Sequence, residues 1–408
     1  MRQRVGSRHR HQPQGPGPLD GIRVVDLTRA LSGPFCTMLL GDQGAEVLKI
    51  ERPGGGDDTR QQSNPRMGGE NSAFLAVNRN KKSVVLDLRQ PGGVEVVRRL
   101  VAVSDVFVEN FRPGKAEEMG LGWEQLREVN PRLVYCSISG WGADGPDAGR
   151  AGYATTAEAV GGLMSVTGER GGLPVKVGVS IVDNLTGVFA KDAITAALFA
   201  RERTGQGQKI ETSLLESTVA TLSMAAYAYL MAGVVAERWG SEHQWHVPWK
   251  TFQTSNGQIV IASSSEDQWR KICRALERRD LADDERFTTM QHRAEHREEL
   301  YAILDTILAR RTSADWLAAL SNAGAAAASV NTIDQVFAEP QVLHRDMLQK
   351  VIHATLGEIP QVGHAQKFSS TPAQIRLPPP VLGQHTREVL CDLAGCTETE
   401  LQQLKTDE

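Results

Sequence analysis

Residues 22–51 read IRVVDLTRALSGPFCTMLLGDQGAEVLKIE, and this stretch decides the fold class. Its first six residues, IRVVDL, are rich in β-branched side chains and predict a strand. Gly33 and Pro34 open a helix that continues to about Asp42, because proline suits a first helical turn. The last six residues, EVLKIE, predict a second strand. A strand, a helix and a strand in succession are typical of parallel strands joined by a crossover helix.

The same alternation continues along the chain. SVVLDL (83–88), DVFVE (105–109) and LVYCSI (133–138) predict three more strands, and a helix begins near Pro91. We therefore predict an α/β fold with a mainly parallel sheet covered by helices. No G-x-G-x-x-G follows the first strand, so the ordinary dinucleotide-binding fingerprint is absent.

A glycine-rich segment at 161–178 predicts a loop around one short helix, and 184–203 predicts a long apolar helix. The glycines of TGQG (204–207) end that helix. From about Trp239 the sequence pattern changes, and it predicts a separate, smaller domain. FQTSNGQIVIAS (252–263) predicts a hairpin that turns at Asn-Gly, and mixed-charge helices follow.

Two more segments near the end of the chain have a recognisable pattern. Residues 351–368 predict paired strands around Leu356-Gly357, and 384–393 predict a last helix.

Residues 217–236 contain no charged side chain and are long enough to cross a bilayer. Their Ser, Thr, Ala and Tyr content favours instead a buried helix, at a subunit interface.

Composition excludes several classes of function. The 408 residues have a formal net charge of −4, so nothing points to nucleic acid or an anionic membrane as a partner. The five cysteines are scattered, without a C-x-x-C pair, which favours a reducing cytoplasm over a disulfide framework or a zinc site. Residues 1–18 have no apolar signal-peptide core and predict a disordered tail.

Asp183 is the most interesting acidic residue, because it lies between the glycine-rich segment and the long apolar helix. Its side chain could cap that helix, and the residues alone favour this interpretation. A carboxylate near free N–H donors also stays ionised and can act as a nucleophile. His243 and His246 have no third ligand nearby in the sequence, so we interpret them as loop histidines and predict no metal.

Several motifs together are highly specific. The sequence resembles the class III coenzyme A transferases, which include formyl-CoA transferase, carnitine CoA-transferase and the α-methylacyl-CoA racemases. It is most similar to the succinate–hydroxymethylglutarate CoA-transferase branch, and the resemblance runs from Leu19 to about Leu393. Its clearest motifs are LDGIRVVDLTRALSGPF (19–35), GAEVLKIERPGGGDDTR (44–60), NRNKKSVVLDL (78–88), DVFVENFRPG (105–114), AGYATTAEAVGGLMSVTG (151–168) and RERTGQGQKIETSLLES (201–217).

The resemblance implies an enzyme of acyl-CoA metabolism with Asp183 as the nucleophile. CoA would pass from an acyl-CoA donor, expected to be succinyl-CoA, to a free acid, expected to be a dicarboxylate. Asp183 would form first an anhydride and then a CoA thioester. CoA is a substrate here, and no cofactor or metal is implied. Such an acid needs a second cationic anchor, for which the neighbourhood offers Arg238, Lys176, His243 and His246.

The resemblance also implies the CoA contacts. They are expected at Leu31, Ser32, Arg52, Leu86, Arg89, Asn110, Phe111, Arg112, Ala151, Gly152, Tyr153 and Ala154. Three positions depart from the family pattern. Leu31 stands where the family often has Gln, Glu118 replaces a basic residue, and Ala154 replaces the Asp of a Gly-Tyr-Asp motif.

Two alternatives to transfer stay open. The family's racemases use a histidine thirty residues before the aspartate, and Tyr153 occupies that position here. Neutral tyrosine is a poor base because its pKa is about 10, so we place the racemase below the transferase. Ala154 motivates the second alternative, an inert CoA-binding protein.

The resemblance finally implies the domain arrangement. We expect a large Rossmann-like domain built from both chain ends (19–220 and 330–408), with a linker helix and a small central α+β domain at 221–329. Two chains are expected to interlock as a cytoplasmic homodimer.

Overall fold

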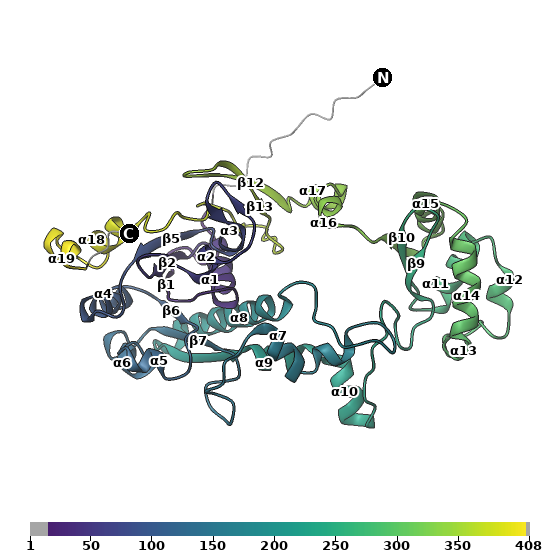
Figure 1. The fold of residues 1–408 in the computed structure, drawn as a ribbon, viewed down its shortest axis with the longest axis horizontal. Coiled ribbons are helices and arrows are strands. Elements are labelled where there is room, and N and C mark those ends of the chain that lie inside the picture. The colour runs from purple at the N-terminus through teal and green to yellow at the C-terminus, as the bar shows by residue number, and fades with distance from the viewer. Residues whose placement is uncertain (1–14, 405–408) are drawn as a thin grey trace, which may run out of the picture. The chain divides into compact units, whose positions relative to one another are not determined.

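The computed structural model in Figure 1 describes residues 15–404. This part of the chain forms two compact units. The first contains the described residues up to Leu163, Val177–Ser223 and those from Gln341 onward, and the second contains Met164–Lys176 and Met224–Pro340. Of the predicted tail at 1–18, residues 1–14 lie outside the described range. The domain boundaries expected at 221 and 329 stay predictions.

The first unit is built on a parallel sheet of six strands. Their order is β5-β2-β1-β6-β7-β8, and each neighbouring pair is parallel. The order reverses between β1 and β6, as in doubly wound dinucleotide-binding folds. The strands are β1 (Arg23–Asp26), β2 (Glu46–Glu51), β5 (Lys81–Val85), β6 (Val106–Glu109), β7 (Val134–Ser139) and β8 (Gln208–Ser213).

Both faces of this sheet are covered, because alternate residues of each strand point to opposite sides. Val24 and Val108 belong to one apolar core, and Val25 and Phe107 belong to the other. Helices α1 and α8 cover the first face, and α4 and α6 the second (Figure 1). These helices are α1 (Ser32–Asp42), α4 (Pro91–Ala102), α6 (Trp123–Val129) and α8 (Ile181–Thr204).

The predicted strands are confirmed at 22–27, 46–51, 105–109 and 133–138, each to within two residues. The strand expected at 83–88 lies at Lys81–Val85, because the chain leaves the sheet at Leu86. Strand β8 was not predicted from the sequence. It lies at the sheet edge and half of its residues are exposed, so QKIETS lacks the apolar pattern of a buried strand.

The prediction of one continuous helix at 217–236 is wrong, whereas its burial at a subunit interface stays a prediction. The chain forms α9 (Leu214–Thr221) and α10 (Ser223–Ala232), and the break falls at Ser223, which has a φ of 46°. Every residue of α10 is at least partly exposed in this chain. Within residues 15–404, no helix is long and apolar enough to span a membrane.

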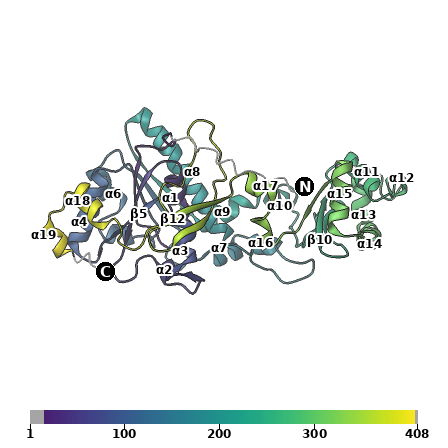
Figure 2. The same cartoon turned by 90° about the horizontal axis from the view of Figure 1, so that it is seen from above.

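The second unit has its own antiparallel sheet of three strands, β9 (Trp249–Gln253), β10 (Gln258–Ala262) and β11 (Ala326–Ser329). The first two form the predicted hairpin, and Gln253 pairs with Gln258 beside the Asn-Gly turn. Buried Trp269 and Trp316 anchor its core. Figure 2 shows its helices, α11 (Glu266–Ala275), α12 (Asp280–Asp283), α13 (Met290–Glu295), α14 (Arg297–Leu308) and α15 (Ser313–Ala323).

The predicted late pair of strands and last helix are also present. The strands are β12 (Leu348–His353) and β13 (Gly357–Val362), and the helix is α18 (Thr386–Asp392). The remaining elements are α2 (Asp58–Gln61), β3 (Arg66–Met67), β4 (Glu70–Asn71), α3 (Ser72–Val77), α5 (Lys115–Glu118), α7 (Ala154–Val160), a 3-10 turn (Leu163–Val166), α16 (Ile333–Val336), α17 (Pro340–His344) and α19 (Glu398–Gln403).

Candidate active site

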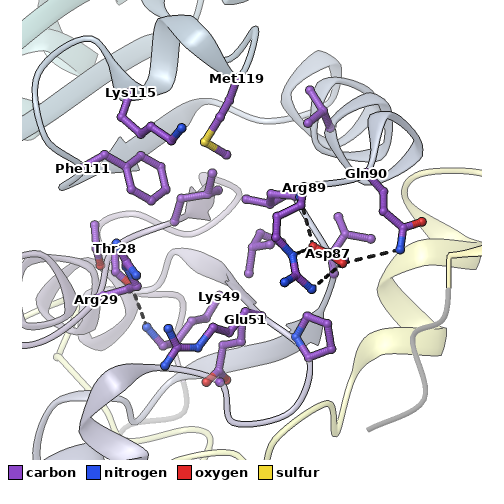
Figure 3. Close-up of a pocket in the computed structure, with 18 of the residues that line it drawn as sticks. Thr28, Arg29, Lys49, Glu51, Asp87, Arg89, Gln90, Phe111, Lys115 and Met119 are labelled. Atoms are coloured by element: carbon purple, nitrogen blue, oxygen red, sulfur yellow. Dashed lines mark hydrogen bonds and ion pairs between the residues drawn. The ribbon is translucent and has the colours of Figure 1, made fainter.

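A cavity of about 840 Å³ opens at the carboxyl ends of the parallel strands (Figure 3). Its walls come from the segments that follow β1, β2, β5 and β6, represented by Arg29, Arg52, Arg89 and Phe111. The cavity thus lies where the strand order reverses, which is the usual ligand position in open α/β sheets.

Charged side chains dominate the rim of this cavity. Arg52 pairs with Asp58 at 2.8 Å, and Arg89 pairs with Asp87 at 2.9 Å. The hydrogen bonds from Arg89 hold the pKa of Asp87 at about 2. Guanidinium groups paired in this way are the side chains that suit phosphate, which can replace a carboxylate as their partner. The lining cations are Arg29, Lys49, Arg52, Arg89, Arg98 and Lys115, and the lining acids are Glu51, Asp57, Asp87, Glu95 and Glu118.

The floor of the cavity is a buried ion-pair network. Lys49 Nζ lies 2.8 Å from Asp57 Oδ2, and neither side chain is exposed to solvent. Burial alone would raise the pKa of Asp57, but Lys49 and the backbone and hydroxyl of Thr59 hold it at about 2. The Asp57 carboxylate also accepts the backbone N–H of Ala30. The network therefore fixes the loop between β1 and α1.

Asn110 fixes that loop from the other side. Its Oδ1 accepts the backbone N–H of Arg29 at 2.8 Å, and its Nδ2 donates to the Arg29 carbonyl at 2.7 Å. The loop then enters α1 at Ser32. Gly187 of α8 packs directly on this helix start, since a Cβ at 187 would lie 2.7 Å from the Ser32 carbonyl oxygen.

Asp183 lies one turn before Gly187, in the first turn of α8. The residue at the helix cap is Ser180, so the capping interpretation of Asp183 is wrong. The Asp183 side chain is half-buried, and no hydrogen bond within residues 15–404 stabilises its charge. Burial, and second the nearby Glu158, raise its pKa to about 6. The carboxylate is therefore ionised at neutral pH but poorly stabilised, which suits a nucleophile.

Glu158 was not predicted as a site residue. It lies on α7, is only 2% exposed, and its Oε2 accepts the backbone N–H of Val177 at 3.1 Å. The sequence does contain a signal, because Glu158 is the only charged residue between 151 and 168. A lone acid in an apolar, glycine-rich segment has to be buried or functional.

The family of this chain follows from comparison with known proteins. Residues 19–386 match CoA-transferase family III. The chain belongs to this family. Succinyl-CoA:glutarate CoA-transferase of Mus musculus is 44% identical over 387 residues, which cover 95% of this chain and 89% of that protein. Succinate–glutarate CoA-transferase of Agrobacterium fabrum is 38% identical over 393 residues, covering 95% and 98% of the two chains.

The fold of this family III transferase is also that of a solved relative. The crystal structure of a CAIB/BAIF family protein from Brucella suis superposes with a TM-score of 0.84 at 38% identity. The match covers 93% of this chain and 100% of that one. The family prediction from the sequence motifs is therefore confirmed, and so is the α/β class.

The predicted CoA contacts of the transferase fall into two groups. Arg52, Leu86, Arg89 and Phe111 line the cavity. The others lie outside its lining: Leu31 and Ser32 at the start of α1, Asn110 on the Arg29 backbone, Arg112 on the surface, and Ala151, Gly152, Tyr153 and Ala154 at the start of α7.

Four of the cations that line the cavity were not predicted from the sequence, namely Arg29, Lys49, Arg98 and Lys115. Arg29 lies in the segment that follows β1. Ligands of open α/β sheets bind beside such segments, so its position after the first strand was a usable signal. Lys115 lies three residues before Glu118, where the family pattern has its basic residue, and the two side chains pair at 2.9 Å. A cation thus reaches the cavity wall despite the acid at 118.

The candidates for a second anchor all belong to the second unit. Arg238 donates from Nε to the Gly172 carbonyl and from Nη1 to the Ser165 carbonyl, both at 3.1 Å. The rings of His243 and His246 stack at 4.3 Å, and Nδ1 of His243 accepts two backbone N–H groups. No three potential metal-ligating side chains are grouped anywhere in residues 15–404.

Proposed function

We propose that this family III transferase moves CoA from succinyl-CoA to a dicarboxylic acid such as glutarate, with Asp183 as the nucleophile. The observation that carries the proposal is the environment of Asp183, an ionisable carboxylate with a raised pKa and no hydrogen-bond partner within residues 15–404. The named activities of the mouse and Agrobacterium relatives support the choice of substrates.

The chemistry proceeds by four exchanges at Asp183. Its carboxylate oxygen attacks the thioester carbonyl, and the C–S bond breaks to give an anhydride and the CoA thiolate. The thiolate attacks Cγ of Asp183, which releases succinate and leaves an aspartyl-CoA thioester. The acceptor carboxylate attacks the same Cγ and expels the thiolate, which forms a second anhydride. The thiolate then attacks the acceptor carbonyl, so that the new acyl-CoA leaves and Asp183 is regenerated.

Two physical requirements follow from this route. The thiolate must stay close while it is free, and the cations of the cavity wall provide the charge to hold the phosphates of CoA. Water must be kept from the anhydride, because hydrolysis would end the cycle. The half-buried position of Asp183 on the packed start of α8 supports the second requirement.

Between the two candidate activities, CoA transfer is favoured over racemisation. That reaction needs a second base, and the side chain at the corresponding position is Tyr153, which is 74% exposed in this chain. The inert CoA-binding protein is tested directly by measuring turnover.

We also propose the interlocked homodimer. Five large apolar side chains of α10 are 59–81% exposed in this chain, namely Met224, Tyr227, Tyr229, Leu230 and Met231. Exposed apolar groups on one helix are typical of a subunit interface. Sedimentation should give a dimer, and a stable folded monomer would contradict it.

The five cysteines are unpaired, which supports a reducing compartment such as the cytoplasm.

The test is a panel of acids incubated with succinyl-CoA and read by mass spectrometry. We expect glutaryl-CoA or another dicarboxylyl-CoA as the main product, and no product with Asp183→Asn. Products from monocarboxylates alone would contradict the dicarboxylate assignment.

A further inference from the structure

Glu158 is a buried acid that the four exchanges do not use. It is 2% exposed, and the hydrogen bond that its Oε2 accepts within residues 15–404 comes from a backbone N–H, not from a cation. A buried carboxylate without a counter-ion is costly, and such groups are usually retained for a function.

The packing of two helices places Glu158 beside Asp183. Ala157 of α7 and Val182 of α8 are fully buried in one small apolar cluster, and the two acids are the next residues along each helix. Glu158 also accepts the N–H of Val177, four residues before α8 begins. It therefore fixes the chain that enters the helix and sets a negative charge near the nucleophile.

Glu158 also differs from the other charged groups near Asp183 in its electrostatic effect on that carboxyl. Among the residues that the structure describes, Glu158 is the one charged side chain that shifts the pKa of Asp183. The other titratable groups on the elements packed around the pair are Tyr153 at the N-cap of α7, Cys36 and Asp42 on α1, Lys191, Asp192, Arg201, Glu202 and Arg203 on α8, Tyr135 and Cys136 on β7, Lys209 and Glu211 on β8, and Glu216 on α9, and Lys176 precedes Val177 in the chain.

We propose that Glu158 is a positioning residue that orients the start of α8 and, by like-charge repulsion, favours acylation of Asp183. The inference rests on the proposed role of Asp183 as the nucleophile. In the free protein two carboxylates repel each other in a partly desolvated site. When Asp183 attacks the thioester, its negative charge passes to the departing sulfur and the aspartyl group becomes neutral. The repulsion is then relieved, so acylation is more favourable than it would be for an isolated aspartate.

The decisive variant is Glu158→Gln. Glutamine keeps the shape and its amide oxygen still accepts the Val177 N–H, so only the charge is removed. We expect the acid limb of kcat/KM to move to lower pH. We also expect the fraction of Asp183 trapped by hydroxylamine at equilibrium with acyl-CoA to fall about three- to tenfold, as for a half to one pKa unit of interaction. Glu202→Gln, at the exposed far end of α8, is the matched control and should change neither.

A double-mutant cycle tests the repulsion without any turnover. At pH 8, Glu158→Gln should raise the melting temperature more in the wild-type protein than in Asp183→Asn, because only the wild-type protein also loses the repulsion between the two carboxylates. Equal effects in both backgrounds, or an unchanged acid limb, would overturn the inference. If hydroxylamine never traps Asp183 in the wild-type protein, the proposed nucleophile is wrong. The double-mutant cycle would still measure the interaction between Glu158 and Asp183. Glu158→Ala, which also loses the Val177 bond, should lower kcat further than Glu158→Gln if the positioning role is correct.

Discussion

The side-chain amide of Asn110 forms two hydrogen bonds with the backbone of Arg29, to its N–H at 2.8 Å and its carbonyl at 2.7 Å. These bonds join the ends of β1 and β6, the two strands between which the sheet order reverses. They also bring the Arg29 guanidinium over the Phe111 ring, 5.5 Å from its centre. One amide thus shapes the cavity wall on both sides of the reversal.

Asn110→Ala should therefore weaken CoA binding through the backbone. Loss of two partly buried hydrogen bonds should cost about 1–3 kcal/mol of folding stability. We expect KM for the acyl-CoA to rise several-fold while the pH dependence of Asp183 stays the same. Urea unfolding and initial rates measure both effects, and an unchanged KM with normal stability would be inconsistent with this role.

The rim arginines should contribute electrostatic affinity. Arg52→Ala and Arg89→Ala should each raise KM for the acyl-CoA by up to about fivefold at low salt, because exposed charges contribute only modestly to binding. The difference should shrink as ionic strength rises. Arg127→Ala is the control, since Arg127 is as exposed as Arg52 (54% and 53%) but lies outside the cavity. Equal effects of Arg127 and Arg52 would argue against a phosphate site here.

The activity should depend on the ionisation of Asp183. Burial and the Glu158 charge raise its pKa to about 6, and only the ionised form attacks the thioester. The kcat/KM of the free enzyme should therefore rise through about pH 6 and level off above it. A profile that is flat from pH 5 to pH 8 would show that another group limits the reaction.

The same pKa predicts a stability effect. The folded pKa of Asp183 lies above the ordinary value of 3.8, so the folded state binds the proton more tightly than the unfolded state. This carboxylate therefore costs stability as pH rises from about 4 to 6, and the cost persists above 6. Asp183→Asn should raise the melting temperature at pH 8 and change it less at pH 4, as calorimetry can measure. The opposite order would contradict the raised pKa.

The buried pair beneath the sheet should be essential for folding. Lys81 and Asp26 are both fully buried and lie 3.1 Å apart. Lys81→Met would leave the Asp26 carboxylate without this partner, which typically costs about 3–5 kcal/mol. The double variant Asp26→Asn with Lys81→Met should recover part of that loss in chemical denaturation. Additive losses would mean that the two side chains do not stabilise each other.

The sequence predicted the parts of the fold whose pattern is local. Buried strands such as β6 contain a continuous apolar run, and the Asn-Gly hairpin has its own turn signal. It missed β8 because an edge strand needs no such run. It also missed Ser223, where a positive φ breaks an apolar stretch without glycine or proline.

The site was predictable only where residues are neighbours along the chain or match the family motifs. Arg52 and Arg89, which line the cavity, and the proposed nucleophile Asp183 were identified in that way, whereas Arg29 was missed. Glu158 was not, because its importance arises from the packing of α7 on α8, which joins residues 25 positions apart. The role of Asn110 is likewise invisible in the sequence, because its partner lies 81 residues away.

The central claim is that the Asp183 carboxylate exchanges an oxygen with the acids it activates. Glutarate labelled with ¹⁸O in its carboxylates should be turned over with succinyl-CoA, and the peptide containing Asp183 then analysed by mass spectrometry. In the proposed route the acceptor oxygen bridges the second anhydride and stays on Asp183 when the thiolate attacks the glutaryl carbonyl. The account predicts ¹⁸O in the Asp183 side chain after turnover. Formation of glutaryl-CoA with no label in Asp183 would contradict it.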